Sequence, residues 1–427
     1  MPINIPSQPY AEPDRATPAC KHFGLCGGCQ LQHLPYSEQL LAKSARLHHL
    51  LTDANLALPQ IQIHPSPPLA YRNRIRLTLS KVAGQLRAGY LRSLSNHAIE
   101  SDAAALSDHD LDSSEDLCSP SAPLTVTFLP IDECLIAAPV LWRATVALIE
   151  QLNESASTWL HDLHLTPDQL ELFTSADQSQ LQFTLTLRSA ARSVPAKLSA
   201  HFHTLCQALR IRVPELTGAG IDIVPQHSRT QSRRNQQPRP GTAWGRPGLN
   251  YPVAETDYWV PRGAFFQVNR FLIPELLSLV TADRTGQLAF DLYAGVGLFS
   301  RVLATRFAQI TAVEIAESAA SALAATKLRN LTAVKATTLD FLQSAAVARD
   351  RPDLIVLDPP RSGAGAQTCA LLARINAPTL VYVSCSPQTL AADLSSLAAA
   401  NYSVHRLYLF DLFPQTTHIE TVAILTR

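Results

Sequence analysis

Residues 288–300 have the sequence LAFDLYAGVGLFS, a short apolar segment that ends in a glycine turn. Three similar apolar segments follow, namely ITAVEI at 310–315, DLIVLD at 353–358 and TLVYVS at 379–384. Helical patterns separate these segments, and strands that alternate with helices are typical of a parallel, doubly wound sheet. We therefore predict an α/β fold from residue 258 onward. The last segments, SVHRLYLF and HIETVAILT, predict an antiparallel hairpin at the edge of this sheet.

The part of the chain before residue 258 mixes helix and strand patterns. Leucine spacing predicts a helix over 37–54 that packs in a core. Residues 71–92 alternate apolar and polar residues around Gly84, which predicts a hairpin, and SQLQFTLTLRS at 179–189 predicts a strand. The polar face of the hairpin is basic: Arg72, Arg74, Arg76, Lys81, Arg87 and Arg92.

The composition is that of a globular protein of two or three domains. The chain has 427 residues, of which 46% are hydrophobic, and its 35 basic residues equal its 35 acidic residues in number. Charge is nevertheless segregated, since residues 95–122 are acidic and predict an exposed insertion. The Arg-rich loop, residues 227–248, combines arginines with Trp244, and this composition suits either RNA contact or a solvated loop.

The N-terminus predicts a cytoplasmic protein. It lacks a secretory signal pattern, and no run of about 18 apolar residues occurs in the chain. Cysteines in that compartment stay reduced, so a tight cysteine cluster indicates metal binding rather than disulfides.

Polar residues follow each strand of the predicted parallel sheet. Gly295 and Gly297 form a turn after the first strand, and Glu314 follows the second, where a carboxylate can accept the ribose hydroxyls of a nucleoside cofactor. The third glycine of the dinucleotide fingerprint is absent, which favours a cofactor without a pyrophosphate, such as S-adenosylmethionine. A glycine turn that only allows a helix to pack on a strand is the alternative. Asp358 and Cys385 follow two later strands and indicate the same crevice.

Two residues of this region are candidates for catalysis. Cys385, between polar neighbours at a strand end, is a candidate nucleophile, although a cysteine can also be an inert apolar residue. Glu420 lies in the apolar segment HIETVAILT, where burial would raise its pKa into the range useful for proton transfer. A glutamate that faces water on an edge strand is the alternative.

The cysteine motif is Cys20-x5-Cys26-x2-Cys29. Three thiolates so close together suit zinc or an iron–sulfur cluster, and both need a fourth ligand. Zinc would usually show a second CxxC pair, which is missing. Cys118 and Cys134 are the candidates for the fourth ligand.

The combination of DPPRSG, VYVSCSPQT and FDLFPQTTHIE, in this order, resembles the S-adenosylmethionine-dependent RNA (uracil-5-)-methyltransferases. The resemblance extends from Cys20 to Arg427. It implies a Rossmann-like class I methyltransferase domain in which Cys385 adds to C6 of uracil and Glu420 removes the C5 proton. It also implies cofactor or active-site roles for a set of residues: Gln267, Tyr293, Gly295, Gly297, Glu314, Asp340 and Asp358.

The resemblance implies a cluster as well. The ribosomal branch of the family carries a [4Fe-4S] cluster on cysteines spaced like Cys20, Cys26 and Cys29, and its fourth ligand precedes an apolar segment similar to CLIAAPVL, which favours Cys134. The family usually has Asn at the position of Ser386 and often at that of Leu298. Many ribosomal members also carry an N-terminal β-barrel, whereas 19 residues precede Cys20 here, so RNA contacts are expected from the basic hairpin and the Arg-rich loop.

These observations predict three parts: a cysteine segment (1–60), an α+β RNA-binding domain (61–257) and a methyltransferase domain (258–427). The expected reaction is methylation of C5 of a uridine in RNA, with 23S rRNA favoured and tRNA as the alternative. A non-catalytic RNA-binding factor is the rival from another class, and the presence of both Cys385 and Glu420 argues against it. Neither a membrane nor an obligate protein partner is expected.

Overall fold

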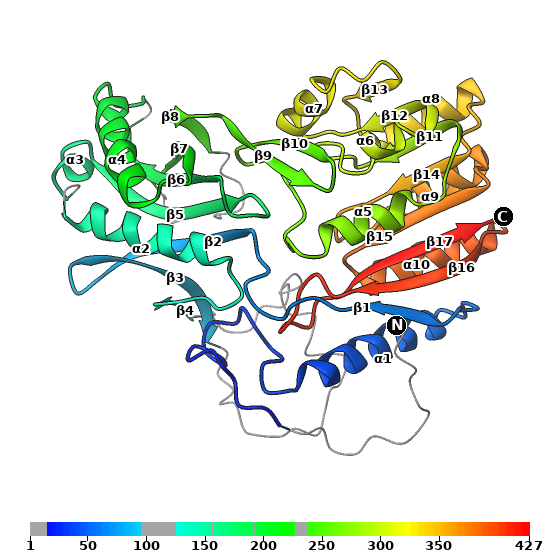
Figure 1. Cartoon of the computed structure of the whole chain (residues 1–427), viewed down its shortest axis with the longest axis horizontal. Coiled ribbons are helices and arrows are strands. Elements are labelled where there is room, and N and C mark those ends of the chain that lie inside the picture. Colours follow the sequence, from blue (N-terminus) through cyan, green and yellow to red (C-terminus); the bar gives the residue numbers. More distant parts are fainter. Residues whose placement is uncertain (1–14, 95–124, 155–156, 192, 227–237) are drawn as a thin grey trace.

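The computed structural model describes residues 15–94, 125–154, 157–191, 193–226 and 238–427. These residues form two lobes, each built around one large β-sheet (Figure 1). The predicted acidic insertion and residues 227–237 of the Arg-rich loop lie outside the described residues. In the described ranges, no helix combines the length and the apolar character needed to cross a membrane.

The C-terminal lobe contains an eight-stranded sheet with the strand order β1-β16-β17-β15-β14-β11-β12-β13. All neighbours pair in parallel except β17, which is antiparallel to both β15 and β16. The four predicted strands are confirmed as β11, β12, β14 and β15. The strands of the sheet are β1 (Ile61–His64), β11 (Gly286–Leu292), β12 (Phe307–Val313), β13 (Leu331–Val334), β14 (Leu354–Leu357), β15 (Thr379–Ser384), β16 (Ser403–Phe410) and β17 (Glu420–Thr426).

Helices cover both faces of this sheet, which confirms the doubly wound fold. One face packs against α1, α8, α9 and α10, and the other packs against α5, α6, α7 and the hairpin of β9 and β10. The predicted N-terminal helix is α1, and its Leu47 and Leu51 are fully buried. The bounds are α1 (Tyr36–Asp53), β9 (Gly248–Val253), β10 (Thr256–Pro261), α5 (Ile273–Thr281), α6 (Ser300–Leu303), α7 (Glu317–Ala324), α8 (Thr338–Ala348), α9 (Ala366–Ile375) and α10 (Pro387–Ala399).

The C-terminal hairpin forms as predicted, but its predicted place at the sheet edge is wrong. β17 lies between β15 and β16, and β16 pairs on its other side with β1, so that Ile61 lies opposite Leu407. Six of the seven residues of β17 are buried, and its apolar run from Val422 to Leu425 is typical of an interior strand covered on both faces. The N-terminal part of the chain therefore supplies the edge strand.

The second lobe contains a seven-stranded sheet with the order β4-β3-β2-β5-β6-β7-β8, antiparallel except for β6 and β7. Its core lies beneath α2, α3 and α4. The predicted hairpin is confirmed as β2 and β3, with Ala83 and Gly84 at positive φ in a two-residue turn. The bounds are β2 (Arg74–Val82), β3 (Gln85–Leu94), β4 (Thr125–Pro130), α2 (Pro139–Glu154), α3 (Ser157–Asp162), β5 (Leu165–Thr174), β6 (Leu181–Ser189), α4 (Leu198–Arg212), β7 (Leu216–Pro225) and β8 (Arg239–Gly245).

Candidate active site

Cys385 and Glu420 lie side by side at the end of the eight-stranded sheet where β15 ends and β17 begins. Ser384, the last residue of β15, is paired with Thr421 of the antiparallel strand β17. When this register is continued by one residue, Cys385, which directly follows β15, comes next to Glu420, the first residue of β17. The sheet topology therefore joins the two candidate catalytic residues, which are far apart in the sequence.

Burial and neighbouring charges set the ionisation of this pair. Burial raises the pKa of the Cys385 thiol to about 12, and the carboxylates of Glu420 and Asp358 add to the effect, whereas Arg361 opposes it. Glu420 is 3% exposed, and burial together with Asp358 raises its pKa well above the ordinary value of a glutamate. The expectation that Glu420 lies buried is thus confirmed, and the alternative of a glutamate facing water is wrong.

Asp358 shares this site and is held by Gln267. The Nε2 atom of Gln267 donates to Oδ2 of Asp358 over 3.1 Å, and Asn73 Nδ2 donates to the Gln267 carbonyl over 2.8 Å. Burial and the nearby Asp291 raise the pKa of Asp358, while the Gln267 amide opposes the rise. Asp358 and Glu420 therefore form a carboxyl cluster. Such a cluster can accept a proton and can hydrogen-bond the polar edge of a substrate base.

His418 completes the polar groups near the pair. Burial lowers its pKa to about 4, and the surrounding cations, Arg361 and Arg72 first among them, lower it further. The imidazole is therefore neutral at pH 7. Its position two residues before Glu420 places an uncharged hydrogen-bonding ring at the start of β17.

A separate cavity of about 480 Å³ opens at the ends of β11 and β12. This volume is within the range of small-molecule sites. Of the seven predicted cofactor residues, Tyr293 and Glu314 line it. The carboxylate of Glu314 accepts hydrogen bonds from the amides of Gly295 over 2.8 Å and Ala316 over 2.6 Å, which fixes its orientation at the cavity wall.

The remaining predicted cofactor residues contribute in other ways. Gly297 has φ +87, and a Cβ there would lie 2.5 Å from Leu323, so the turn requires glycine. Asp340 is outside the cavity lining, and its carboxylate accepts a hydrogen bond from the hydroxyl of Thr337, which does line the cavity. Gln267 and Asp358 lie beside Cys385 and Glu420 rather than in the cavity lining.

Sequence reasoning missed one wall of this cavity, residues 364–368. Asp393, buried in α10, holds this loop: its oxygens accept hydrogen bonds from the amides of Ala364 over 2.7 Å and Gly365 over 3.0 Å, and from the Tyr382 hydroxyl over 2.6 Å. Gly363 and Gly365 lie at the start of this wall, just before α9, and were the available signal in the sequence, whereas no pattern marks Asp393.

The structure places four cysteines around a second, small cavity of about 70 Å³. Cys20, Cys26 and Cys29 come from the N-terminal segment, and Cys134 comes from the connection between β4 and α2. The amide of Gly28 donates to the Cys26 sulfur over 3.4 Å. Within the described ranges, no group of three or more His, Cys, Asp or Glu side chains has an arrangement that could hold a metal ion. Cys118 lies outside these ranges.

Comparison with known proteins agrees with this geometry. Residues 249–427 match the family model of tRNA (uracil-5-)-methyltransferases. Two proteins described as 23S rRNA (uracil(1939)-C(5))-methyltransferase RlmD, from Chromohalobacter salexigens and Halomonas elongata, are 29% and 28% identical to this chain. Each alignment covers 97% of this chain and 77% of the relative.

A solved structure has the same fold. It is the Pyrococcus abyssi tRNA (uracil-54, C5)-methyltransferase in complex with S-adenosyl-L-homocysteine, with a TM-score of 0.63 at 20% identity. The match covers 93% of this chain and 86% of that one. The family-model match over residues 249–427, together with the relatives that are similar along nearly the whole of this chain, supports assignment to the S-adenosylmethionine-dependent RNA (uracil-5-)-methyltransferase family.

Proposed function

We propose that the enzyme methylates C5 of a uridine in 23S rRNA. The observation that carries this proposal is the proximity of Cys385, Glu420 and Asp358 where β15 and β14 end and β17 begins. The RlmD relatives, similar along nearly the whole chain, support the ribosomal substrate.

In this proposal Cys385 is the nucleophile and Glu420 is the base. The Cys385 sulfur forms a bond to C6 of uracil, and the resulting carbanion at C5 takes the methyl group that S-adenosylmethionine supplies. Glu420 then accepts the C5 proton, and the bond between C6 and the Cys385 sulfur breaks, which restores the ring. Because the pKa of the thiol is raised, Cys385 must lose its proton to a neighbouring carboxylate or to solvent before it attacks.

We further propose that the cavity beside Glu314 holds the cofactor. The fixed Glu314 carboxylate suits the ribose hydroxyls, and the side chain of Ile315, which lines the same cavity, is 58% exposed and offers an apolar surface for a base. Tyr293 lies in the same wall, and the turn at Gly295 and Gly297 lets the backbone approach closely.

A [4Fe-4S] cluster on Cys20, Cys26, Cys29 and Cys134 is also proposed. Four thiols from two segments line one cavity, which supplies the number and type of donors that the cluster needs. Among the described residues, these side chains do not form an arrangement that could hold a metal ion, so they would have to turn toward a common centre when the cluster binds. Anaerobic purification of wild type should give a brown protein with about four irons per chain. Cys134→Ser should lose this iron, whereas Cys206→Ser, which changes a buried cysteine of α4, should keep it. Stoichiometric zinc in place of iron would refute the cluster.

RNA contact through the part we assign to residues 61–257 is a further part of the proposal. Arg76 and Arg87 are exposed on the β2–β3 hairpin. Glu171 pairs with both Arg74 and Arg76, so the basic face is less positive than its sequence indicates. Arg87→Gln should weaken RNA binding and flatten its salt dependence by about one unit of slope.

Transfer RNA is the second candidate substrate, because the matching family model and the Pyrococcus abyssi protein are both described as tRNA methyltransferases. The test is incubation with methyl-labelled cofactor and separate pools of ribosomal and transfer RNA that lack 5-methyluridine. Labelled 5-methyluridine in 23S rRNA supports the proposal. Label in transfer RNA alone would replace the substrate, and no label in either pool would refute methylation of these RNAs.

A further inference from the structure

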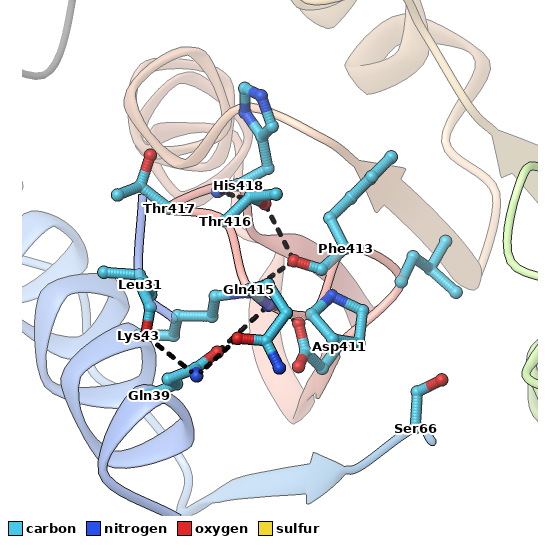
Figure 2. A network of polar contacts seen from close by, with 12 residues as sticks. Leu31, Gln39, Lys43, Ser66, Asp411, Phe413, Gln415, Thr416, Thr417 and His418 are labelled. Carbon is cyan, nitrogen blue, oxygen red and sulfur yellow. Dashed lines mark hydrogen bonds and ion pairs between the residues drawn. The ribbon is translucent and has the colours of Figure 1, made fainter. Parts of the chain in front are cut away.

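The loop of residues 411–418 connects β16 to β17 and leads directly to Glu420. Helix α1 lies beside this loop, and its Gln39 and Lys43 side chains reach the loop (Figure 2). The Nζ atom of Lys43 lies 2.6 Å from Oδ1 of Asp411 and 2.9 Å from the carbonyl oxygen of Phe413. The side chains of Lys43 and Asp411 are 2% and 0% exposed, so this ion pair is fully buried.

Further contacts extend the attachment along the loop. The amide of Gln39 donates to the side chain of Gln415 over 2.9 Å, and its oxygen accepts from the Gln415 backbone over 3.0 Å (Figure 2). The amides of Gln30 and Leu31, which directly follow the cysteine motif, both donate to the Gln415 carbonyl. Gln415 has φ +68, a left-handed conformation that these contacts hold in place.

The second oxygen of Asp411 is also occupied. Tyr36 of α1 donates its hydroxyl to Asp411 Oδ2 over 2.8 Å, and the same hydroxyl accepts from the amide of Ser66 over 2.9 Å. The start of the loop is therefore bonded through both carboxylate oxygens to one helix. A buried ion pair gives little net stability compared with apolar residues, but it fixes one geometry because either partner left alone is costly.

We propose that Lys43 is a positioning residue for the removal of the C5 proton. Through Asp411 and the Phe413 carbonyl it holds the 411–418 loop so that Glu420 remains beside Cys385. This inference rests on the proposed function. The inference also goes beyond the proposed function, because it gives α1 a part in setting the catalytic geometry. This helix lies outside residues 249–427, the part of the chain that matches the family model.

The test is Lys43→Met, which keeps most of the length of the side chain but removes the charged amine. Turnover on the RNA pool that wild type methylates should fall about 10- to 100-fold, the cost expected when a catalytic group moves by roughly an ångström. The KM for the cofactor should stay within about twofold, because the loop does not line the cofactor cavity. A denaturation-resistant adduct of protein with methyl-labelled RNA should accumulate, since bond formation by Cys385 continues while proton removal stalls.

Lys327→Met is the matched control, because Lys327 is an exposed lysine after α7, outside both the 411–418 loop and residues 61–257. It should retain wild-type turnover without an adduct. Turnover of Lys43→Met within twofold of wild type would overturn the inference, and so would a parallel loss of turnover and adduct.

If Lys43→Met does not bind the cofactor, the double variant Lys43→Met/Asp411→Asn leaves no unpaired buried charge and should still accumulate the adduct. A double variant that turns over without an adduct would overturn the inference. If wild type itself forms no 5-methyluridine, the proposed function fails, which separates that failure from a failure of the role of Lys43.

Discussion

Asp393→Asn is the perturbation that tests most sharply how the scaffold builds the proposed cofactor cavity. Three donors converge on the Asp393 carboxylate: the Ala364 amide and the Tyr382 hydroxyl on Oδ2, and the Gly365 amide on Oδ1. Asparagine keeps only one acceptor oxygen. If that oxygen serves Ala364 and Tyr382, the new NH₂ group faces the Gly365 amide, and two donors are left opposed.

The magnitude follows from these contacts. A buried donor without a partner costs about 1–3 kcal/mol, and each of the two remaining bonds loses about 1 kcal/mol when its acceptor is no longer charged. The loop is half-buried, so water relieves part of the loss, and about 3 kcal/mol remains. At about 2.1 cal/mol/K per residue, a chain of 427 residues has an unfolding entropy of about 0.9 kcal/mol/K, so the melting temperature should fall by roughly 3 °C.

The cavity should respond together with the stability. Because residues 364–368 form one wall, a displaced loop should raise the Kd for S-adenosylmethionine about tenfold, equivalent to about 1.4 kcal/mol. Thermal unfolding and calorimetric titration measure the two quantities. Ser396→Ala, an exposed position of the same helix, should change neither. Wild-type melting temperature and affinity in Asp393→Asn would refute this account of the loop.

The other predictions concern the buried charges and the glycine turn. Asp358→Asn should abolish turnover but stabilise the fold by about 1–3 kcal/mol at pH 8. Folding raises the pKa of Asp358, so the wild-type carboxyl costs more stability as the pH rises above about 4. The stabilisation by Asp358→Asn should therefore vanish in melting curves at pH 4. Equal stabilisation at pH 4 and pH 8 would contradict the raised pKa of Asp358. Gly297→Ala should lower the melting temperature more than Gly295→Ala, because both positions have positive φ but only Gly297 would clash, with Leu323; equal losses would argue against the steric role. Glu420→Gln should accumulate a methylated RNA–protein adduct on denaturing gels, and free turnover in that variant would exclude Glu420 as the base.

Local apolar patterns predicted much of the C-terminal lobe. The strands before Asp358 and Cys385 are short apolar runs bounded by polar residues, and a parallel sheet brings their ends to one edge. The hairpin of β16 and β17 was wrongly predicted to form the sheet edge because the strand that pairs with β16, the four-residue strand β1, comes from more than 300 residues earlier, and such a short segment shows no distinctive pattern.

The residues that hold the site in place were harder to predict. Lys43 and Asp393 each lie on a helix, and lysine and aspartate are common on exposed helix faces, so their residue types do not indicate burial. Only the folded chain shows that both side chains are buried and hydrogen-bonded to loops. Glu420 was accessible to sequence reasoning because a lone carboxylate in an apolar strand is conspicuous. The polar contacts of Lys43 and Asp393 depend on tertiary packing between distant segments, which no local pattern encodes.

The most direct test of the central claim uses RNA in which 5-fluorouridine replaces uridine. Fluorine replaces the hydrogen at C5, so no proton is available for the base to remove. The reaction should therefore stop after methyl transfer, at the covalent adduct between Cys385 and C6. Digestion and mass spectrometry of wild-type protein should then find the methylated 5-fluorouridine attached to the peptide that contains Cys385. Attachment to another residue, or methyl transfer without any attachment, would contradict the assignment of Cys385 as the nucleophile.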